Sequence, residues 1–455
     1  MNGLKIERDS GQCDDFSQIY VDLTAKEDEQ IVIMDTEGRE EHTFIPLKDL
    51  LYGDLTLLAS YPKQHHDKLS EYKRRIEGYD FSIIEVRDVP IDVATEIFTR
   101  INVSGQPLTL FEIMVAKTYD ERRDFDLAKK FDELVSNLEQ VNYETLSDAA
   151  VLQLVSLLLR GDCKKQTILK LEKNKFIETW PKAVDAIERA TEYFRNAYRI
   201  PVSHLLPYNT LLAPFGYFFY YHPDKPNAEQ NKFLKDFFWR TSLGGRYSSA
   251  VESKLAQDIR RMDSILKNKS PDYDWGVDLS PKFMLENGWF NAGRSFTKAV
   301  LCLYAYQIPK SFNDNSLVNI SNDWLKQANS KNYHHFFPRT YLERQGVDEN
   351  KINNIVNITI VDDYLNKREI RAKPPSTYMK TFSIGNPDLT KTMRTHLITN
   401  LDDFGTWSND YERFLDQRAL AISRELRKRV ISRDIDEHGQ VSREDDFEEE
   451  MASFE

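Results

Sequence analysis

Residues 333–338 read YHHFFP and are followed by two further patterned stretches, NNIVNITIV, which contains Asn357, and DDYLNKREI, which contains Asn366. Short aromatic and β-branched runs favour strands, whereas the polar stretch around Asn366 is typical of a short helix. The order strand, turn, strand, helix follows from this alternation. We expect His334 and His335 in the first strand. Asn357 then opens the second strand, and Asn366 lies on the helix.

These side chains suit chemistry on a phosphate. Adjacent residues on a strand point to opposite sides, so one histidine can hold a metal ion while the other acts on a water molecule. Histidine suits the second role because its unperturbed pKa lies near neutrality. The Asn366 oxygen is a hard ligand suited to Mg²⁺, which takes phosphate oxygens as further ligands and stabilises the charge that develops there. Lys367 and Arg368, next to Asn366, can contact the phosphate backbone.

HHFFP, the later NITIV and the following NK resemble the ββα-metal motif of HNH endonucleases. The resemblance implies that His335 is the general base and that His334 is a metal ligand. Asn366 would be the second protein ligand of one Mg²⁺ or Mn²⁺ ion. Asn357 would be the middle Asn of the motif, which braces the loop and orients the base. The third position of the motif holds Asn here, where some HNH enzymes have His.

Two upstream stretches extend the resemblance. Residues 96–109 read EIFTRINVSGQPLT, and FFWRTS at 237–242 is followed by RYS at 246–248. Both stretches are similar to GmrSD-type proteins, which are type IV, modification-dependent restriction enzymes and their relatives in bacterial anti-phage defence. The similarity covers most of the chain from about 80 to 430. It implies a ParB/sulfiredoxin-like N-terminal domain that senses or hydrolyses nucleotide, then a helical region and a C-terminal HNH nuclease.

One departure concerns the nucleotide domain. The D-G-Q-Q-R signature of that domain is not found in this chain. Residues 9–13, DSGQC, are partly similar to it but lack the Arg, and two further acidic residues follow them. We therefore expect the chain to begin after that motif, either as a truncated form or as a naturally short member. The resemblance therefore does not imply that the activity of this chain depends on a nucleotide.

The predicted fold is mainly α with α+β parts. It comprises a partial ParB-like region at 1–120, a helical domain at 121–310, an HNH ββα-metal domain at 311–435 and an acidic disordered tail at 436–455. Thr109 with Glu112 forms a capping-box pattern that begins a helix. Short β-rich runs are expected at 19–23, 30–34 and 81–86, and helical spacing at 67–76, 122–139, 146–160, 178–198, 207–221, 228–242, 249–267, 291–306 and 408–432.

Composition narrows the class of protein. The chain has 455 residues, 40% of them hydrophobic, and a net charge of −12, which excludes a globally basic nucleic-acid binder. A local basic site remains open, because residues 331–400 hold 11 Lys/Arg against 7 Asp/Glu. Three scattered cysteines argue against a disulfide scaffold and fit a reducing cytosol. The apolar stretch 205–221 contains two prolines and is interpreted as buried helix and turn, so we expect a cytoplasmic protein without a membrane partner.

Several conspicuous residues have structural interpretations. The dipeptide His65-His66 lacks a downstream Asn pattern and is interpreted as a surface loop. In residues 96–109 a helix-turn-helix corner, with Gly105 at positive φ and Pro107 starting the next helix, is favoured over ligand contact.

The same structural reasoning covers the aromatic and basic runs. Arg240 and Tyr247 are expected to fix packing, and the aromatic run 215–221 to be core rather than a base-stacking platform. The basic side chains between 418 and 429 fit a DNA contact and a solvated helix face equally well.

We therefore predict a metal-dependent DNA endonuclease of bacterial anti-phage defence, with DNA, including modified phage DNA, as its partner. The alternative is a catalytically inactive or truncated subunit that binds DNA or a partner carrying the nucleotide-binding domain. A third alternative is a nuclease acting on RNA. A single ββα site cuts one strand at a time, so duplex cleavage needs a homodimer or two visits.

Overall fold

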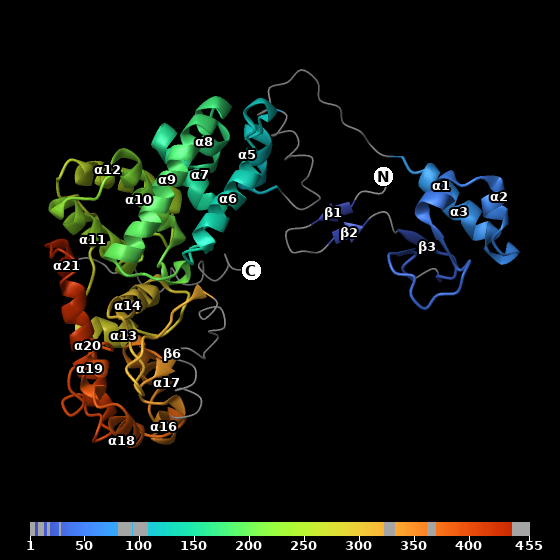
Figure 1. Cartoon of the computed structure of the whole chain (residues 1–455). Coiled ribbons are helices and arrows are strands. Elements are labelled where there is room, and N and C mark those ends of the chain that lie inside the picture. Colours follow the sequence, from blue (N-terminus) through green and yellow to red (C-terminus); the bar gives the residue numbers. More distant parts are fainter. Residues whose placement is uncertain are drawn as a thin grey trace. The chain divides into compact units, whose positions relative to one another are not determined.

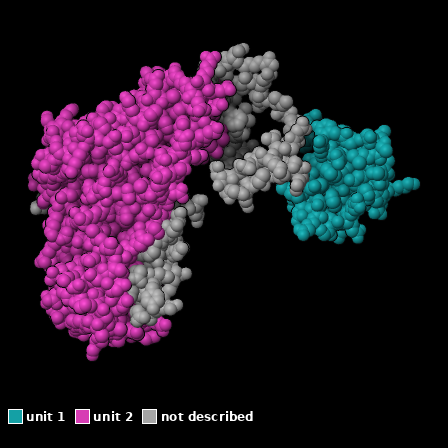
Figure 2. All heavy atoms as spheres, in the orientation of Figure 1, with its two compact units in different colours: residues 1–88 teal, residues 89–455 magenta. Residues whose placement is uncertain are grey.

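The computed structural model describes residues 5–7, 13–15, 19–26, 29–80, 93, 108–322, 333–361 and 370–438. The described chain is mainly helical with small sheets, as the sequence predicts. It divides into two compact units, residues 1–88 and residues 89–455 (Figure 2).

The first unit pairs a small sheet with short helices. Its three-stranded antiparallel sheet has the order β4-β3-β5, and Ile45 and Val21 in its centre are buried together with Leu50 and Leu69 from the helices. The strands confirm the runs expected at 19–23 and 30–34, whereas 81–86 lies outside the described residues. The elements are β1 (Lys5–Glu7), β2 (Cys13–Asp15), β3 (Tyr20–Asp22), β4 (Val32–Ile33), β5 (Phe44–Pro46), α1 (Leu47–Tyr52), α2 (Leu55–Ala59), η2 (Lys63–His65) and α3 (His66–Glu77).

The His65-His66 dipeptide is not a surface loop, so that prediction was wrong. His65 ends η2 and is only 7% exposed, while His66 begins α3. The Nε2 atom of His66 lies 2.7 Å from the carbonyl oxygen of Tyr61. The contact between His66 and Tyr61 closes the turn between α2 and α3. It depends on how this turn is folded, which the dipeptide itself does not determine.

The second unit begins with helices that follow the predicted pattern closely. Thr109 caps α5, and its side chain and that of Glu112 form the expected capping box. The helices are α5 (Leu110–Thr118), η4 (Glu121–Arg123), α6 (Leu127–Glu139), α7 (Asp148–Arg160), α8 (Lys165–Leu169), α9 (Lys173–Ala197), η5 (Ser203–Leu205), η6 (Asn209–Leu211), α10 (Leu212–Tyr221), α11 (Ala228–Leu243), α12 (Val251–Leu266), α13 (Pro281–Asn287) and α14 (Ser295–Tyr306). The predicted turn at Gly105 and Pro107 lies outside the described residues.

Helix α10 is the centre of this helical region and packs against α7, α9 and α12 (Figure 1). Phe215, Phe218 and Phe219 are buried, which confirms the first part of the aromatic run as core, whereas Tyr221 at its end is 52% exposed, so the prediction was wrong there. Gly216 permits the close approach of α7, because a Cβ atom there would meet the Leu154 side chain at 2.7 Å. No helix among the described residues is long and apolar enough to cross a membrane.

The remainder of the second unit contains one pair of described strands and several helices, of which α20 is the longest. Strands β6 and β7 are antiparallel, and α16 and α17 occupy the connection for which a turn was predicted. The elements are β6 (Tyr333–His335), α16 (Arg339–Arg344), α17 (Glu349–Ile352), η7 (Ile355–Asn357), β7 (Ile358–Ile360), α18 (Pro375–Gly385), α19 (Leu389–Arg394), α20 (Tyr411–Arg427) and α21 (Ile435–His438).

Helix α14 joins the two parts of this unit. It contacts α11 on one side and both β7 and α20 on the other, and its residues from Ala299 to Ala305 are buried (Figure 1). One continuous hydrophobic core therefore reaches from Met114 to Val430. The boundaries predicted at 120/121 and 310/311 stay predictions. The expectation of disorder from residue 436 onward was wrong for residues 436–438, which lie in α21.

The predicted basic face of α20 is only partly a surface. Arg424, Arg427 and Lys428 are exposed, but Arg418 is fully buried and Arg429 is 8% exposed. The prediction that the basic side chains are either solvated or in contact with DNA was therefore wrong for Arg418 and Arg429. Arg418 follows Phe414 by one helical turn, so it lies on the stripe that faces the core.

Candidate active site

The strand pair β6–β7 places both candidate histidines as the sequence predicts. His334 lies opposite Thr359, and His335 lies opposite Ile358. The Thr359 hydroxyl donates to the His334 carbonyl oxygen at 3.1 Å, which adds a side-chain bond to the ladder. Because neighbouring residues on a strand alternate in direction, the two imidazole rings lie on opposite faces of the pair.

Asn357 directly precedes β7 and binds the turn that follows β6. Its side chain is fully buried; Oδ1 accepts from the Phe337 N–H at 2.9 Å, and Nδ2 donates to the carbonyl oxygens of Phe337 at 3.0 Å and Ile352 at 3.1 Å. The Phe336 N–H donates to the Asn357 carbonyl oxygen at 2.8 Å. Asn357 therefore fixes the backbone that leaves the two histidines. Its role in orienting a base remains a prediction.

His335 is partly buried beside an amide. Its Nε2 atom lies 3.1 Å from Oδ1 of Asn353. Burial lowers the pKa of His335; the Asn353 hydrogen bond opposes this effect, and the nearby charge of Arg339 adds to it. A histidine with a lowered pKa is neutral at physiological pH and has a lone pair free to accept a proton.

His334 lies in an aromatic environment on the other face. It is 3% exposed, and its ring meets the Tyr378 ring edge-on with centroids 6.4 Å apart. The Tyr378 hydroxyl donates to the Phe336 carbonyl oxygen, which fixes the strand end beside His334. Imidazole nitrogens suit the later transition metals best, whereas the predicted Asn366 oxygen suits both Mg²⁺ and Mn²⁺, so the fit of either ion rests on Asn366.

The other predicted site residues, Asn366, Lys367 and Arg368, lie outside the described residues. Within the described part of the chain, no group of three or more His, Cys, Asp or Glu residues could hold a metal ion. The predicted ligands are His334 and Asn366, of which only His334 belongs to those residue types, so a site made by this pair would not form such a group.

Helix α20 supports the turn after β6 from behind. The Phe336 and Phe414 rings are stacked at 4.7 Å with an interplanar angle of 6°, and Phe337 packs against Tyr411 at 5.1 Å between centroids. The buried Arg418 guanidinium donates to the Val356 carbonyl oxygen at 2.6 Å and to that of His396 at 3.3 Å. Its carbon Cζ lies 4.8 Å from the Tyr304 ring centroid.

Sequence reasoning missed three residues that shape this site, namely Asn353, Asn354 and Arg418. Asn354 is buried; Nδ2 donates to the Leu285 carbonyl oxygen at 3.0 Å, and Oδ1 accepts from the Val356 N–H at 2.9 Å. The Asn-Asn dipeptide just before Asn357 was a visible signal for the first two. Arg418 gave no such signal, because a single Arg on an amphipathic helix is ordinarily exposed.

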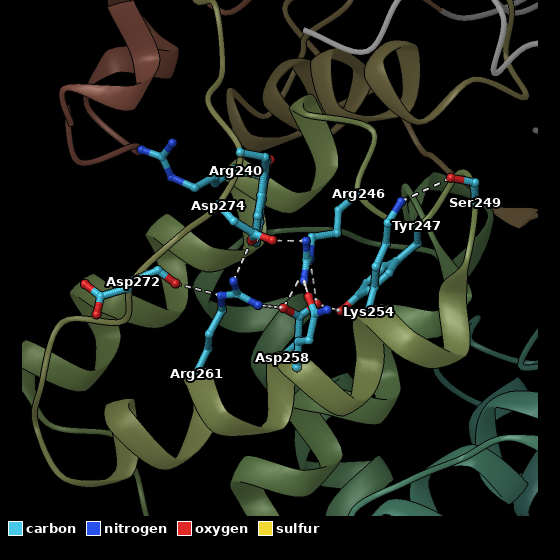
Figure 3. A network of polar contacts seen from close by, with 11 residues as sticks. Arg240, Arg246, Tyr247, Ser249, Lys254, Asp258, Arg261, Asp272 and Asp274 are labelled. Atoms are coloured by element: carbon cyan, nitrogen blue, oxygen red, sulfur yellow. Dashed lines mark hydrogen bonds and ion pairs between the residues drawn. The ribbon is translucent and has the colours of Figure 1, made fainter. Parts of the chain in front are cut away.

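A second polar cluster lies between α11, α12 and the following loop (Figure 3). The buried Asp258 accepts from Arg246 at 3.0 Å, from the Tyr247 hydroxyl at 2.7 Å and from Arg261 at 2.7 Å. Trp275 lies under Arg246, 3.9 Å from its Cζ to the ring centroid. The charged side chains of this cluster are therefore paired with one another, in agreement with the packing role expected of Tyr247.

Arg240 is likewise buried in a network of protein groups. Its guanidinium binds both oxygens of Asp436 and donates to the Ile431 carbonyl oxygen at 2.8 Å. Asp236 lies on the same helix, 3.7 Å from the Arg240 Nε atom. Arg240 therefore fixes the packing of the C-terminal segment on α11, as expected.

No protein-family model matches the chain. An uncharacterized protein of Methanocaldococcus jannaschii, MJ0686, is 23% identical to it over 381 residues. The match covers 76% of this chain and 60% of that relative, so the chain spans about three fifths of the relative's length. The name of this relative does not state an activity.

Proposed function

We propose that the chain is a metal-dependent endonuclease that hydrolyses DNA phosphodiester bonds at an HNH site in its C-terminal part. One observation carries this proposal: the β6–β7 pair holds His334 and His335 on opposite faces, and the buried Asn357 ties the turn behind them. A base and a metal ligand on adjacent strand positions can act on the same phosphate from two directions only if that backbone is rigid.

In the proposed reaction His335 acts as the general base. Its neutral imidazole takes a proton from a water molecule, and the water oxygen forms a bond to phosphorus. The bond from phosphorus to the sugar oxygen on the opposite side breaks, and that oxygen takes a proton from solvent. The lowered pKa of His335 supports this role, because the ring is then unprotonated at neutral pH.

His334, together with Asn366, would hold one Mn²⁺ or Mg²⁺ ion, which supplies positive charge to the phosphate when it is bound. The protein's own contribution would be to position the two ligands. On the described side, the Thr359 hydroxyl holds the His334 backbone carbonyl, and the Tyr378 ring lies edge-on to the imidazole. Lys367 and Arg368 would contact neighbouring phosphates. The resemblance to GmrSD-type enzymes supports DNA as substrate and anti-phage defence as the setting, in the cytoplasm of a bacterium.

The test is nicking of supercoiled plasmid by the purified chain with Mn²⁺ or with Mg²⁺. Unmodified DNA, glucosyl-hydroxymethylcytosine DNA and a single-stranded RNA are compared. The proposal expects cutting that EDTA abolishes and that His335→Ala lowers by about 100-fold or more. His42→Ala, at an exposed histidine of the first unit, is the matched control and is expected to cut like the wild type.

Equal activity in His335→Ala and wild type would show that another residue or a contaminant cuts the DNA. A folded protein that cuts none of the substrates with either ion would contradict the proposal and favour the non-catalytic subunit. Cutting of RNA alone would retain the site and replace the substrate.

A further inference from the structure

Asn353 touches the His335 ring and is itself held by Phe290. Its Nδ2 atom donates to the Phe290 carbonyl oxygen at 3.1 Å, and the Phe290 N–H donates to the Asn353 carbonyl oxygen at 2.8 Å. A bridge between Trp289 and Asn354 extends this pairing by one residue. Asn353 is therefore fixed through both its backbone and its side chain before it meets His335.

The Phe290 carbonyl group determines which way the Asn353 amide faces. A carbonyl oxygen only accepts hydrogen bonds, so the NH₂ group must face Phe290. Oδ1 then faces the His335 ring, 3.1 Å from Nε2, and it too can only accept. Nε2 of His335 must consequently carry a hydrogen and donate it. In the neutral ring, Nδ1 is left as the basic nitrogen.

We propose that Asn353 is a positioning residue that holds His335 in the Nε2–H form and so makes Nδ1 the atom that takes the proton from water. The proton step rests on the proposed function, whereas the contact between the two side chains does not. When the water O–H bond breaks, the proton moves to Nδ1, and the Nε2–H bond to Asn353 persists in the imidazolium. The ring therefore keeps its orientation throughout the step.

The test compares Asn353→Ala and Asn353→Asp in the full chain with Asn350→Ala as matched control. Asn350 lies on α17, the helix that Asn353 caps at its C-terminal end; it is exposed and is not placed in the site. Nitrogen-15-labelled histidine is observed by NMR at alkaline pH, where the ring is neutral, and His335→Gln identifies the signals of His335. Circular dichroism shows that each variant is folded.

In the wild type and in Asn350→Ala we expect a Nε2–H proton of His335 that is protected from exchange with water. Asn353→Ala loses this signal and nicks DNA about 10- to 100-fold more slowly, by analogy with the loss caused when a metal-ligating histidine is deprived of its orienting partner. Asn353→Asp keeps the signal, because a carboxylate still accepts the bond, and it recovers part of the lost rate.

A wild-type ring that carries its hydrogen on Nδ1 would overturn the inference, as would an unchanged Nε2–H signal in Asn353→Ala. A slower Asn353→Ala enzyme with an unchanged signal would make Asn353 merely structural and would also overturn it. If the wild type cuts no nucleic acid, the proposed function fails, and the NMR signals alone then decide whether Asn353 orients the ring.

Discussion

At the scale of the residue, the side chains of two asparagines stabilise the β6–β7 strand pair and its connection. Asn357 satisfies three backbone groups that belong to Phe337 and Ile352, and Asn353 links His335 to Phe290. Buried backbone groups that lose such a partner are left without water, and each loss costs free energy. These asparagines therefore matter to stability whether or not the site is catalytic.

Asn357→Ala is expected to lower the free energy of unfolding by about 3 kcal/mol, because it leaves the Phe337 N–H and two carbonyl groups without partners. Urea unfolding followed by circular dichroism measures the change. Asn350→Ala, at an exposed position, is the control and should stay within about 0.5 kcal/mol of the wild type. A loss below about 1 kcal/mol for Asn357→Ala would contradict the bracing role.

His396 makes stability depend on pH. Burial lowers its pKa from 6.5 to about 4; the hydrogen bond to the Lys310 carbonyl oxygen opposes this effect, and the charge of Arg418 adds to it. The unfolded state therefore binds more protons between these two values. Stability is expected to fall by about 3 kcal/mol as pH drops from 6.5 to 4, with no further loss from His396 below that.

Unfolding of the wild type and of His396→Gln across this pH range measures the effect, since glutamine can still donate to the Lys310 carbonyl oxygen. The glutamine variant should show the shallower loss. His42→Gln, at an exposed histidine, should follow the wild type. Parallel curves for the wild type and His396→Gln would show that His396 does not contribute.

Helix α20 acts as a support at the scale of the element. One face carries Phe414 against the turn after β6 and Arg418 beneath the carbonyl groups of Val356 and His396, while Arg424 on another face is exposed. A guanidinium can satisfy several carbonyl groups from a single position, which a shorter side chain cannot do. The helix therefore contributes both a polar and an apolar contact to the site.

Arg418→Ala is expected to destabilise the protein by about 3 kcal/mol, since it leaves a cavity and two buried carbonyl groups without their donor. Arg424→Ala is the matched control on the same helix, and its exposed side chain should cost no more than about 0.5 kcal/mol. Thermal and urea unfolding of both variants give the comparison. Equal stability of the two would mean that burial of Arg418 brings no net gain.

At the scale of the whole second unit, a C-terminal clasp joins the segment after α20 to α11. Asp436 accepts from the Val277 and Arg433 N–H groups at 3.0 Å each and binds the buried Arg240. Burial alone would raise the pKa of Asp436, but the bond from Arg240 and the other contacts outweigh it and lower the pKa. The clasp therefore links the helical region to the helix that supports the candidate site.

Asp436→Ala is expected to lower the unfolding free energy by about 3 kcal/mol, because the buried Arg240 loses both of its bonds to Asp436 and the Val277 N–H loses its acceptor, while Arg240 keeps Asp236 and the Ile431 carbonyl oxygen. Asp434→Ala, two positions earlier and exposed, is the control and should be near neutral. Urea unfolding measures both. A near-neutral Asp436→Ala would contradict the clasp.

The strand pair and its two histidines were predictable because the signal is local. Alternation of β-branched and aromatic residues determines β6 and β7, and Asn357 could be assigned to the opening of β7 from its place in NNIVNITIV. The contacts of Asn353 were not predictable. They depend on Phe290, which is distant in the sequence and lies in the connection between α13 and α14.

The sequence by itself determined the mainly helical class, the approximate extent of most of the longer helices and the capping box at Thr109, because these depend on residues within one or two turns of each other. Only the tertiary structure decided which polar side chains are buried. His65 and Arg418 have ordinary surface-like sequence neighbours, yet packing removes both from water. Burial is a property of distant segments that meet, and no local pattern records it.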